Sequence, residues 1–578
     1  MVLLDLDRGK EKGSTFVDRL RHVRFADNIP LVTADVRDSK VPSWIRKGMS
    51  GVFMKHGFHA LLLQGIRETI QGKLYLRKQV AMNPNSRTGK YMCRKTVRCA
   101  VAHVCELPRY KQVLSFLTGF AFFCSFANAQ APVKEAVPFD LLITGATIVS
   151  MDSDRRVIEN GFLAVRGDEI VAIGQDATLH YPRGVIATTH IDASGKLIIP
   201  GLINGHTHIP MTLMRGLKDD VVLDDWLHKF IFPAEARNVT EDFVRWGSRL
   251  GLAEMIRSGT TTFADMYYFE DAVAEETKAA GLRGVLGETW IDFPAPDNKN
   301  EAAMTAYTEK FLKKWHDDPL IRPAVAPHSI YTCSARTLRD AAALARKYHA
   351  PILIHLAEMR KEFVDSLEKN GTTPVQYLER IEVLGPDMLA AHCTWTDNTD
   401  MKILADRQVG CVHNPSSNMM LASGVAPVVD QRAAGMRVGL GTDGPAGSNN
   451  DLNMMEEMDL AAKLQKTYRV DPRALGAKGA LEMATIDGAR ALHMENAIGS
   501  LEVGKKADFV VLSLNAPNAV PMYDVYSEIV YALKGSDIET VVVGGKTLLK
   551  DGKVLTVDEA QVVVKAREYG KKVAASLK

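Results

Sequence analysis

The residues with the clearest capacity for chemistry are two histidines, His206 and His208, in the stretch PGLINGHTHIPMTLMRG at residues 200–216. They follow the apolar run KLIIPGLIN, which is typical of a buried strand. Because residues i and i+2 of a strand point to the same face, both imidazoles would point into the same space. A histidine at a strand end is more often structural than functional, so a metal site requires further ligands elsewhere in the chain.

Further polar residues follow other apolar runs of the chain: His328, His355, Glu358, His392, His413 and Asp443. Three imidazoles and one carboxylate around an open coordination position describe a catalytic site for a divalent metal. We therefore assign four residues to the metal: His206, His208, His355 and Asp443. Zinc is the default ion, with Fe(II) and Mn(II) as alternatives for nitrogen and oxygen ligands. A second ion would need a bridging ligand, usually a modified lysine ending the fourth strand, and RPAVAPHS offers none, so we predict one ion.

The other polar residues suit acid and base chemistry. A metal of this kind lowers the pKa of a water molecule toward 7, and Asp443 can take the remaining proton. Glu358, three residues past a predicted ligand, is close enough to carry a proton to the substrate. His392 can orient the water or a developing oxyanion, and His328 can do the same or contact the substrate. His413, followed by Asn-Pro, is interpreted only as part of a turn.

These residues need a scaffold that brings distant segments to one place. Between residues 201 and 495, apolar runs of strand length alternate with helical stretches, which indicates βαβ units and a parallel sheet. Eight runs have this character: IIPGLINGHTH, TTTFADM, LRGVLGETW, IRPAVAPHS, PILIHLAE, MLAAHC, VGCVHNP and RVGLGTDG. Eight repeats over about 290 residues match a (β/α)8 TIM-like barrel, whose active sites form at the carboxyl ends of the strands. We therefore predict the α/β class, with a catalytic barrel over residues 201–495.

The two flanks of the predicted barrel follow another pattern. Residues 139–200 and 496–578 contain short strands in which apolar and polar residues alternate, separated by Gly and Asp. Because these strands cannot belong to the barrel, we predict that both flanks combine in one small composite β-sandwich domain. A helix is expected at the C-terminal end of the second flank.

The first 129 residues carry other signals. Residues 1–112 contain 22 Lys and Arg against 9 Asp and Glu, and residues 1–106 are predicted as a poorly structured basic extension. In residues 107–129, basic residues precede an uncharged apolar run and Ala-Asn-Ala, the order of a secretory signal peptide. A buried helix is the alternative.

Since a signal peptide acts at the N-terminus, we hypothesise that translation starts downstream, at Met92 or nearer Arg109. The protein is then exported to the periplasm or the extracellular space; without a working signal it is cytoplasmic.

Several segments together resemble the amidohydrolase superfamily: PGLINGHTH, SGTTTFADM, HLAE, AHC, HNPSSN and GLGTDG. They are most similar to the branch that contains 5′-methylthioadenosine/S-adenosylhomocysteine deaminases, adenosine-type deaminases and triazine chlorohydrolases. The resemblance covers about residues 139–555. It implies a single metal ion held by the four ligands assigned above.

The resemblance also implies roles for residues around the metal. Glu358 would protonate a ring nitrogen while water attacks the carbon that bears the amine, so that ammonia leaves. Glu235, in FIFPAEARN, matches a glutamate that holds the two ribose hydroxyls in these deaminases, and a carboxylate suits two such donors. His328, in APHS, matches a histidine that contacts the substrate.

The expected function is therefore that of a metal-dependent hydrolytic deaminase with an adenosine-like small-molecule substrate or a related aminated heterocycle. The chain departs from the family at two places. Met420 occupies a position where a lysine is common, and no arginine follows the third strand, where relatives use arginines to bind the homocysteine tail. A hydrolase with another leaving group, such as a triazine chlorohydrolase or cyclic amide hydrolase, is the alternative. The third alternative is a non-catalytic scaffold. Such a protein should have lost some metal ligands, whereas all four predicted ligands are present here.

The acidic balance after residue 112 excludes nucleic acid as the main partner. No membrane association is expected after signal cleavage, and a homo-oligomer is an open expectation.

Overall fold

A computed structural model describes residues 138–177 and 186–577, together with four short strands nearer the N-terminus. The chain divides into two units, Met1–Lys134 and Glu135–Lys578. In the first unit the described strands pair in parallel in chain order: β1 (Leu4–Asp5), β2 (Ile29–Thr33), β3 (Met49–Met54) and β4 (Tyr75–Leu76). The rest of the predicted basic extension and the signal-like segment, residues 107–129, lie outside the described residues.

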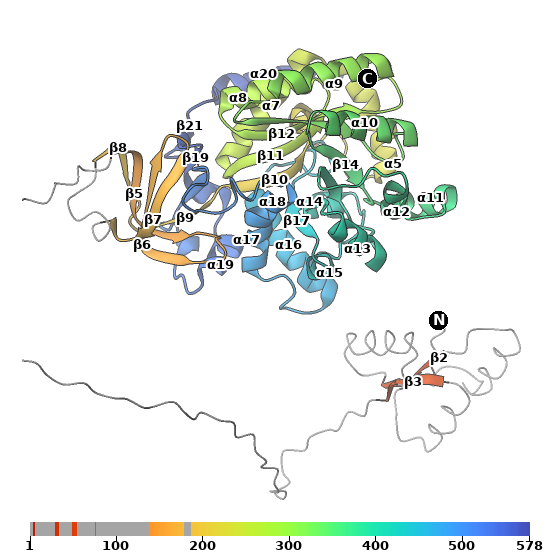
Figure 1. The fold of residues 1–578 in the computed structure, drawn as a ribbon, viewed down its shortest axis with the longest axis horizontal. Coiled ribbons are helices and arrows are strands. Elements are labelled where there is room, and N and C mark those ends of the chain that lie inside the picture. The colour runs from red at the N-terminus through yellow and green to blue at the C-terminus, as the bar shows by residue number, and fades with distance from the viewer. Residues whose placement is uncertain are drawn as a thin grey trace, which may run out of the picture. The chain divides into compact units, whose positions relative to one another are not determined.

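The second unit contains the predicted (β/α)8 barrel (Figure 1). Its eight-stranded sheet consists of β10 (Leu202–Thr207), β11 (Thr260–Tyr267), β12 (Arg283–Trp290), β13 (Ile321–Pro327), β14 (Ile352–Leu356), β15 (Met388–His392), β16 (Gly410–His413) and β17 (Arg437–Leu440). Each strand pairs in parallel with the next in the chain. A parallel bridge between Thr207 and Asp443 joins the first strand to the segment after the last and closes the cylinder.

Helices after the strands surround the barrel: α7 (Glu241–Arg257), α8 (Glu270–Ala280), α9 (Glu301–Trp315), α10 (Ala335–Lys347), α11 (Arg360–Asn370), α12 (Pro374–Arg380), α13 (Asn398–Asp406), α14 (Pro415–Met420), α15 (Val428–Ala433), α16 (Met454–Arg469), α17 (Ala477–Ala484) and α18 (Ile486–Ala491). Local sequence sets many of their ends. The side chains of Asn300 and Ser334 accept backbone N–H groups at the starts of α9 and α10. Gly281 and Gly371 end α8 and α11 in the left-handed conformation.

Four elements between β10 and α7 lie at the carboxyl ends of the strands: η1 (Ile209–Met214), α5 (Leu223–Asp225), the π-helix η2 (Trp226–Ile231) and α6 (Phe232–Asn238). A π-helix is rare and is frequently found at functional sites. Here it lies just before the segment that carries Glu235.

The two flanks of the barrel form one β domain, as predicted (Figure 1). The N-terminal flank supplies β5 (Pro138–Val149), β6 (Val157–Arg166), β7 (Glu169–Gln175), β8 (Ile186–Asp192) and β9 (Lys196–Pro200). The C-terminal flank supplies β18 (Phe509–Ser513), β19 (Ile538–Val543), β20 (Lys546–Lys550) and β21 (Lys553–Val554). They are hydrogen bonded in one continuous mixed sheet, in which β9 pairs with β5 in parallel and with β18 antiparallel. The two ends of the chain therefore meet at β9.

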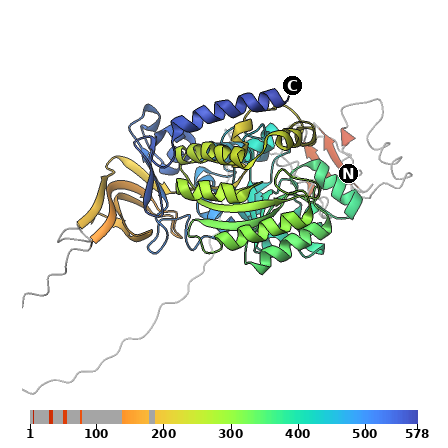
Figure 2. The ribbon, with the colours of Figure 1, turned by 90° about the horizontal axis from the view of Figure 1, so that it is seen from above.

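Four short helices lie between β18 and β19, and one helix follows β21: η3 (Pro517–Ala519), α19 (Val525–Ser527), η4 (Glu528–Ala532), η5 (Gly535–Asp537) and the C-terminal helix α20 (Glu559–Ser576). Helix α20 runs along the outside of the barrel beside α7 (Figure 2). Its Tyr569 ring packs 5.5 Å from that of Phe243 and its hydroxyl donates a hydrogen bond to Asp242.

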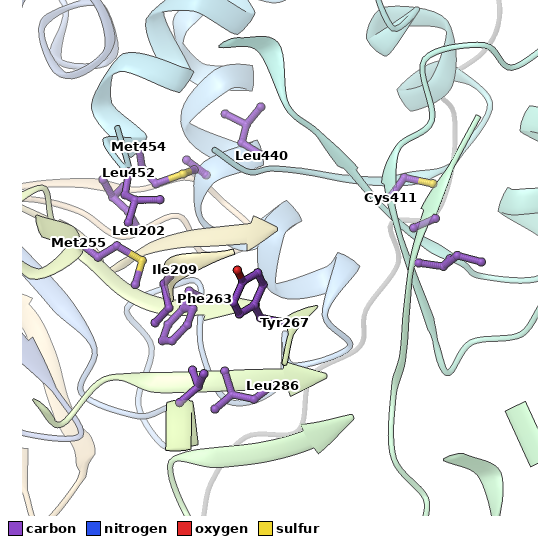
Figure 3. Packing of buried hydrophobic residues seen from close by; sticks show 14 of the residues in the cluster. Leu202, Ile209, Met255, Phe263, Tyr267, Leu286, Cys411, Leu440, Leu452 and Met454 are labelled. Carbon is purple, nitrogen blue, oxygen red and sulfur yellow. The ribbon is translucent and has the colours of Figure 1, made fainter. Parts of the chain in front are cut away.

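The barrel strands form the core because both faces of their sheet are covered. Every residue of β11 and β12 is buried, as expected for parallel strands covered on both faces. Figure 3 shows Ile209, Met255 and Phe263 close together on three different elements of this packing. Among the described residues, none of the helices combines the length and apolarity needed to cross a bilayer.

Candidate active site

The predicted metal ligands meet at the carboxyl ends of the barrel strands. His206 belongs to β10, His355 to β14 and His392 ends β15, while Asp443 lies three residues beyond β17. One ligand atom from each of these four residues lies within 4.8 Å of those of the other three. All four side chains are buried, with residue exposures of 5% or less. The structure therefore contains a metal-binding group of three histidines and one aspartate.

His208 belongs to the same cluster. Its Nε2 lies 3.2 Å from Oδ1 of Asp443, and Nε2 of His206 lies 3.3 Å from the same oxygen. Nε2 of His355 is 3.2 Å from Nε2 of His208. The geometric group contains His392 where our prediction has His208, and the structure brings all five side chains together.

The hydrogen bonds of the rings show that this group suits a cation. Nδ1 of His208 lies 2.6 Å from the carbonyl oxygen of Met266, and Nδ1 of His355 lies 2.9 Å from that of His328. Because a carbonyl only accepts, both Nδ1 atoms donate, and a neutral ring then has its lone pair on Nε2. Two such lone pairs facing each other at 3.2 Å repel unless positive charge lies between them.

Two further ring nitrogens support the same conclusion. Nε2 of His206 and Nε2 of His392 are buried and have no hydrogen-bond partner among the described residues. Burial of an unpaired polar atom is costly, and coordination to a metal removes that cost. Histidines whose second nitrogen is held by a carbonyl or amide oxygen are typical metal ligands. The donor set therefore fits a divalent ion.

Electrostatics around Asp443 also concentrate positive charge at this point. Burial alone would raise the pKa of Asp443, but the contacts of its carboxylate with the rings of His206 and His208 hold that pKa well below its usual range. Burial alone would lower the pKa of His208, but the hydrogen bond and charge of Asp443 raise it to about 9. By contrast, burial lowers the pKa of His206 to about 4 and holds that of His355 well below its usual range. The carboxylate of Asp443 thus favours positive charge at this point, next to the neutral imidazoles of His206 and His355.

Glu358 has the properties of a proton donor. It is buried, and its Oε1 lies 3.9 Å from Nε2 of His392. Burial, together with the negative charge of Asp443, raises the pKa of Glu358 well above its usual range. A raised pKa favours the protonated form, which is the form that a general acid needs.

Glu235 lies in the same cavity, on α6. It is buried, and its Oε1 accepts a hydrogen bond of 2.7 Å from the hydroxyl of Tyr267 at the end of β11. Burial raises the pKa of Glu235 to about 7, and the hydrogen bond from Tyr267 opposes that rise. A carboxylate poised in this way accepts hydroxyl donors from a ligand.

His328 and His413 have different environments. The His328 ring lies 4.6 Å from that of His355 and 6.0 Å from that of Tyr331, measured between centroids, and it borders the cavity. Burial lowers the pKa of His328 to about 3 and that of His413 to about 3, so both rings are neutral. His413 ends β16, outside the four-residue metal group.

A cavity that is partly open to solvent connects these groups. It is lined by His208, Met211, Leu223, Trp226, Leu227, Ile231, Phe232, Glu235, Met266, Tyr267, Tyr268, Thr289, His328, Tyr331, His355, Glu358, His392, Leu421, Asp443 and Ser448. The metal group forms its floor at the strand ends, and the elements between β10 and α7 contribute a large share of its apolar side chains. The cavity can therefore hold a mostly apolar molecule with a few polar groups.

Comparison with known proteins identifies the family. Residues 197–548 match the profile of the Amidohydrolase family, which is more than half of the chain. The chain belongs to the amidohydrolase family. This confirms the resemblance found in the sequence motifs.

The match between this amidohydrolase and its curated relatives spans nearly the full length of those relatives. A 5-methylthioadenosine/S-adenosylhomocysteine deaminase 1 from Syntrophus aciditrophicus is 44% identical over 439 residues, which are 76% of this chain and 98% of the relative. A 5′-deoxyadenosine deaminase from Methanosarcina acetivorans is 41% identical over 438 residues, 75% of this chain and 99% of the relative.

Solved structures of similar fold include an adenosine deaminase from Xanthomonas campestris with bound zinc. It has a TM-score of 0.74 and 35% identity, and the match covers 76% of this chain and 100% of that one. An atrazine chlorohydrolase from Arthrobacter aurescens TC1 has a TM-score of 0.68 at 23% identity, over 74% of this chain and 100% of that one. The second likeness shows the fold alone.

The amidohydrolase site also depends on residues that sequence analysis missed. Oδ1 of Asp265, on β11, accepts hydrogen bonds of 2.6 Å from Oγ1 of Thr207 and 2.6 Å from N–H of Ile209, the two neighbours of His208. Together with the carbonyl of Met266, it fixes the orientation of that histidine. A carboxylate inside the predicted strand TTTFADM was the available signal.

Two other side chains orient the reactive carboxyl groups. Oγ of Ser417 donates a hydrogen bond of 2.6 Å to Oδ2 of Asp443. Glu362 accepts the backbone N–H groups of Ala357 and Glu358, at 3.0 and 2.8 Å, and so holds the backbone at Glu358. Neither contact has a signature in local sequence.

Proposed function

We propose that this amidohydrolase is a hydrolytic deaminase that releases ammonia from adenosine-type nucleosides. The observation that carries the proposal is the placement of Glu358 beside the metal-binding group, with its pKa raised well above its usual range and with Glu235 in the same cavity. A hydrolase of an aminated ring needs a proton donor for the ring nitrogen, and a nucleoside needs an acceptor for its sugar hydroxyls. Relatives that are more than 40% identical carry the names of adenosine-type deaminases.

The reaction can be written with the residues of this chain. A bound divalent cation supplies Lewis-acid activation of a water molecule. Asp443, ionised and buried, accepts the proton that the attacking water loses. Glu358 donates its proton to the ring nitrogen as the water oxygen bonds to the amine-bearing carbon, and His392 lies where it can hydrogen-bond to that oxygen. Asp443 then returns its proton to the amine, which leaves as ammonia, and the proton of the new hydroxyl passes to Glu358, so that a ring carbonyl remains and both carboxyl groups recover their starting protonation states.

We propose zinc as the ion and a stoichiometry of one per chain. Three imidazoles and one carboxylate are ligands that zinc prefers, and the adenosine deaminase of similar structure has bound zinc. Elemental analysis of the purified full chain tests both points. About one zinc per chain supports the proposal, and two ions per chain, or an iron-only protein, contradict it.

We also propose that Glu235 binds the two ribose hydroxyls. Its Oε1 already accepts one donor from Tyr267, which orients the carboxylate, and it borders the cavity that contains the metal group. Glu235→Gln should therefore raise KM for nucleosides much more than it changes the rate on a free aminated base.

The deciding experiment measures ammonia release by the metal-loaded full chain. The panel contains 5′-methylthioadenosine, 5′-deoxyadenosine, adenosine, adenine and an aminotriazine. Ammonia and a keto purine from the nucleosides support the proposal, and Glu358→Gln is the control for a contaminating deaminase. If no purine releases ammonia and the triazine is turned over, the result would favour a hydrolase with another leaving group.

The proposed export of the protein rests on residues 107–129 alone. Their order of basic, apolar and small residues is that of a signal peptide. N-terminal sequencing of the protein from its native host should give a start near Gln130. A native start well upstream of residue 107 would refute export by this segment.

A further inference from the structure

The segment of residues 223–238 covers the mouth of the cavity and determines its chemistry; we call it the covering segment. It consists of α5, η2 and α6. At one end Nε1 of Trp226 donates a hydrogen bond of 3.1 Å to the carbonyl of Ala446, in the loop after β17. At the other end Glu235 accepts from Tyr267 on β11. The covering segment is thus anchored on both sides of β10 and lies across the strand ends.

Its inner face is an apolar stripe. Leu223, Leu227, Ile231 and Glu235 recur at intervals of four residues, and all four line the cavity. Residues at this spacing share one face of a helix. The stripe therefore consists of three aliphatic side chains that end at the glutamate.

Aromatic side chains extend the apolar wall. Phe232 lines the cavity, and its ring lies 5.4 Å from that of Phe293, which follows β12. The same ring lies 6.3 Å from that of His328. The polar residues His228 and Lys229 are exposed on the outer face, where they pair with Asp224 and Asp225.

Neither lysine nor arginine is among the described residues that line the cavity. A carboxylate in the tail of a substrate would therefore meet no ammonium or guanidinium partner on the cavity wall. It would also lose the hydration of that charge against Leu227 and Phe232, which is costly without a partner. A neutral apolar tail meets neither cost and buries apolar surface instead.

The substrate geometry follows from the deaminase function proposed above, on which this inference rests. The amine-bearing carbon must reach the metal group, and the ribose hydroxyls reach Glu235. The 5′ substituent then occupies the rest of the cavity, along the apolar stripe. We propose that the enzyme selects adenosines with an uncharged, apolar 5′ substituent, such as a methylthio or 5′-deoxy group, over those with a charged amino-acid tail.

The test compares kcat/KM of the full-chain metalloenzyme for 5′-methylthioadenosine, 5′-deoxyadenosine and S-adenosylhomocysteine. We expect the two uncharged substrates to exceed S-adenosylhomocysteine by about tenfold or more, since loss of hydration without a partner is a large discriminating effect. Equal or better use of S-adenosylhomocysteine overturns the inference and leaves the deaminase function intact. Absence of turnover on all three refutes the deaminase function instead.

A charged side chain on the apolar stripe tests whether the stripe causes the preference for uncharged substrates. Leu227→Lys should raise the ratio of kcat/KM for S-adenosylhomocysteine to that for 5′-methylthioadenosine by about threefold or more, because the ammonium attracts the tail carboxylate. Leu227→Met, which keeps the size and neutrality of the side chain, should leave the ratio near that of the wild type. An unchanged ratio in a folded, metal-loaded Leu227→Lys enzyme contradicts the role of the stripe.

A second measurement needs no variant. S-Adenosylhomocysteine should inhibit turnover of 5′-methylthioadenosine only at concentrations well above the KM of that substrate. Inhibition at or below that KM would show that the cavity accommodates the charged tail, and would overturn the inference even if every variant misfolds.

Discussion

Glu358 and Asp443 are two buried carboxyl groups with opposite tendencies, a common arrangement where one site needs both an acid and a base. Contacts with two histidine rings lower the pKa of Asp443, while burial and the nearby negative charge of Asp443 raise the pKa of Glu358. The assignment of proton donor and acceptor therefore follows from their surroundings.

Glu358→Gln tests the proton-donor role. The amide keeps the size of the side chain but cannot protonate a ring nitrogen, so kcat/KM for 5′-methylthioadenosine should fall by about 10³-fold. Metal content, measured by elemental analysis, should stay at the wild-type value. A loss of less than tenfold would show that another group supplies the proton.

Asp265→Ala tests the orientation of His208. The change removes the acceptor for Thr207 and Ile209, so the histidine loses the support on both of its sides. Loss of such support typically weakens metal binding by about 10- to 100-fold, which competition with a chelator measures directly. Asp265→Asn is the matched control, because its Oδ1 can still accept both hydrogen bonds. Equal loss in the two variants would show that the charge of Asp265, rather than its hydrogen bonds, matters.

At the scale of elements, the active site combines barrel strands with the covering segment. The strands supply the metal group, because their parallel arrangement places all of their carboxyl ends at one rim. The covering segment supplies Glu235 and the apolar wall. Its hydrogen bond from Tyr267 links the covering segment to β11.

Tyr267→Phe should weaken nucleoside binding in a pH-dependent way. The pKa of Glu235 is raised to about 7, and the hydrogen bond from Tyr267 lowers it. Glu235 is therefore ionised, and able to accept both hydroxyls, above about pH 7 and loses this ability as the pH falls. In the variant the pKa rises further, so KM at pH 7 should increase and recover toward pH 9.

The pH profile of KM for 5′-methylthioadenosine measures this shift. Tyr268→Phe is the matched control, because the hydrogen bond to Glu235 comes from Tyr267 and the two tyrosines are adjacent. A profile for Tyr267→Phe identical to that of the control would rule out the proposed coupling.

At the scale of the whole molecule, a buried ion pair joins the β domain to the barrel. Arg283, at the start of β12, contacts Asp508, just before β18, through Nε at 3.1 Å and Nη2 at 3.3 Å. Its Nη1 donates to the carbonyl of Pro319, and Asp508 accepts the N–H of Gly544. Both charged side chains are therefore satisfied inside the protein.

Arg283→Ala should destabilise the protein strongly. Removal of one partner leaves the carboxylate of Asp508 buried and unpaired, which costs about 3–5 kcal/mol. Arg336→Ala is the matched control, since the pair of Arg336 with Glu301 is exposed and worth about 1 kcal/mol or less. Thermal unfolding of both variants with metal present gives the comparison. Similar melting temperatures for the two would contradict the importance of this contact.

Metal removal should also act on the whole barrel. The metal group joins β10, β14, β15 and the segment after β17, so a bound ion links strands on different sides of the cylinder. A ligand at 100 times its Kd stabilises the folded state by about 3 kcal/mol. Chelation should abolish ammonia release and lower the melting temperature, and added zinc should restore both. An unchanged melting temperature after complete metal removal would contradict this stabilising role.

The sequence by itself determined the barrel and the residues that meet at its rim. Periodic apolar runs specify strands and helices locally, and parallel strands of a closed barrel bring residues such as His206 and Asp443 to one end whatever lies between them. The motif GTDG and the motif HTH could therefore be placed together before any contact was known.

Only the tertiary structure decided which groups support those residues and what covers them. Asp265 holds the neighbours of a histidine 57 positions earlier, and Trp226 contacts a carbonyl 220 positions later. Such contacts depend on the packing of separate segments, which no local pattern encodes. The raised pKa of Glu358 also depends on the tertiary structure. Burial and the charge of Asp443 cause it, and neither is a property of the sequence near Glu358.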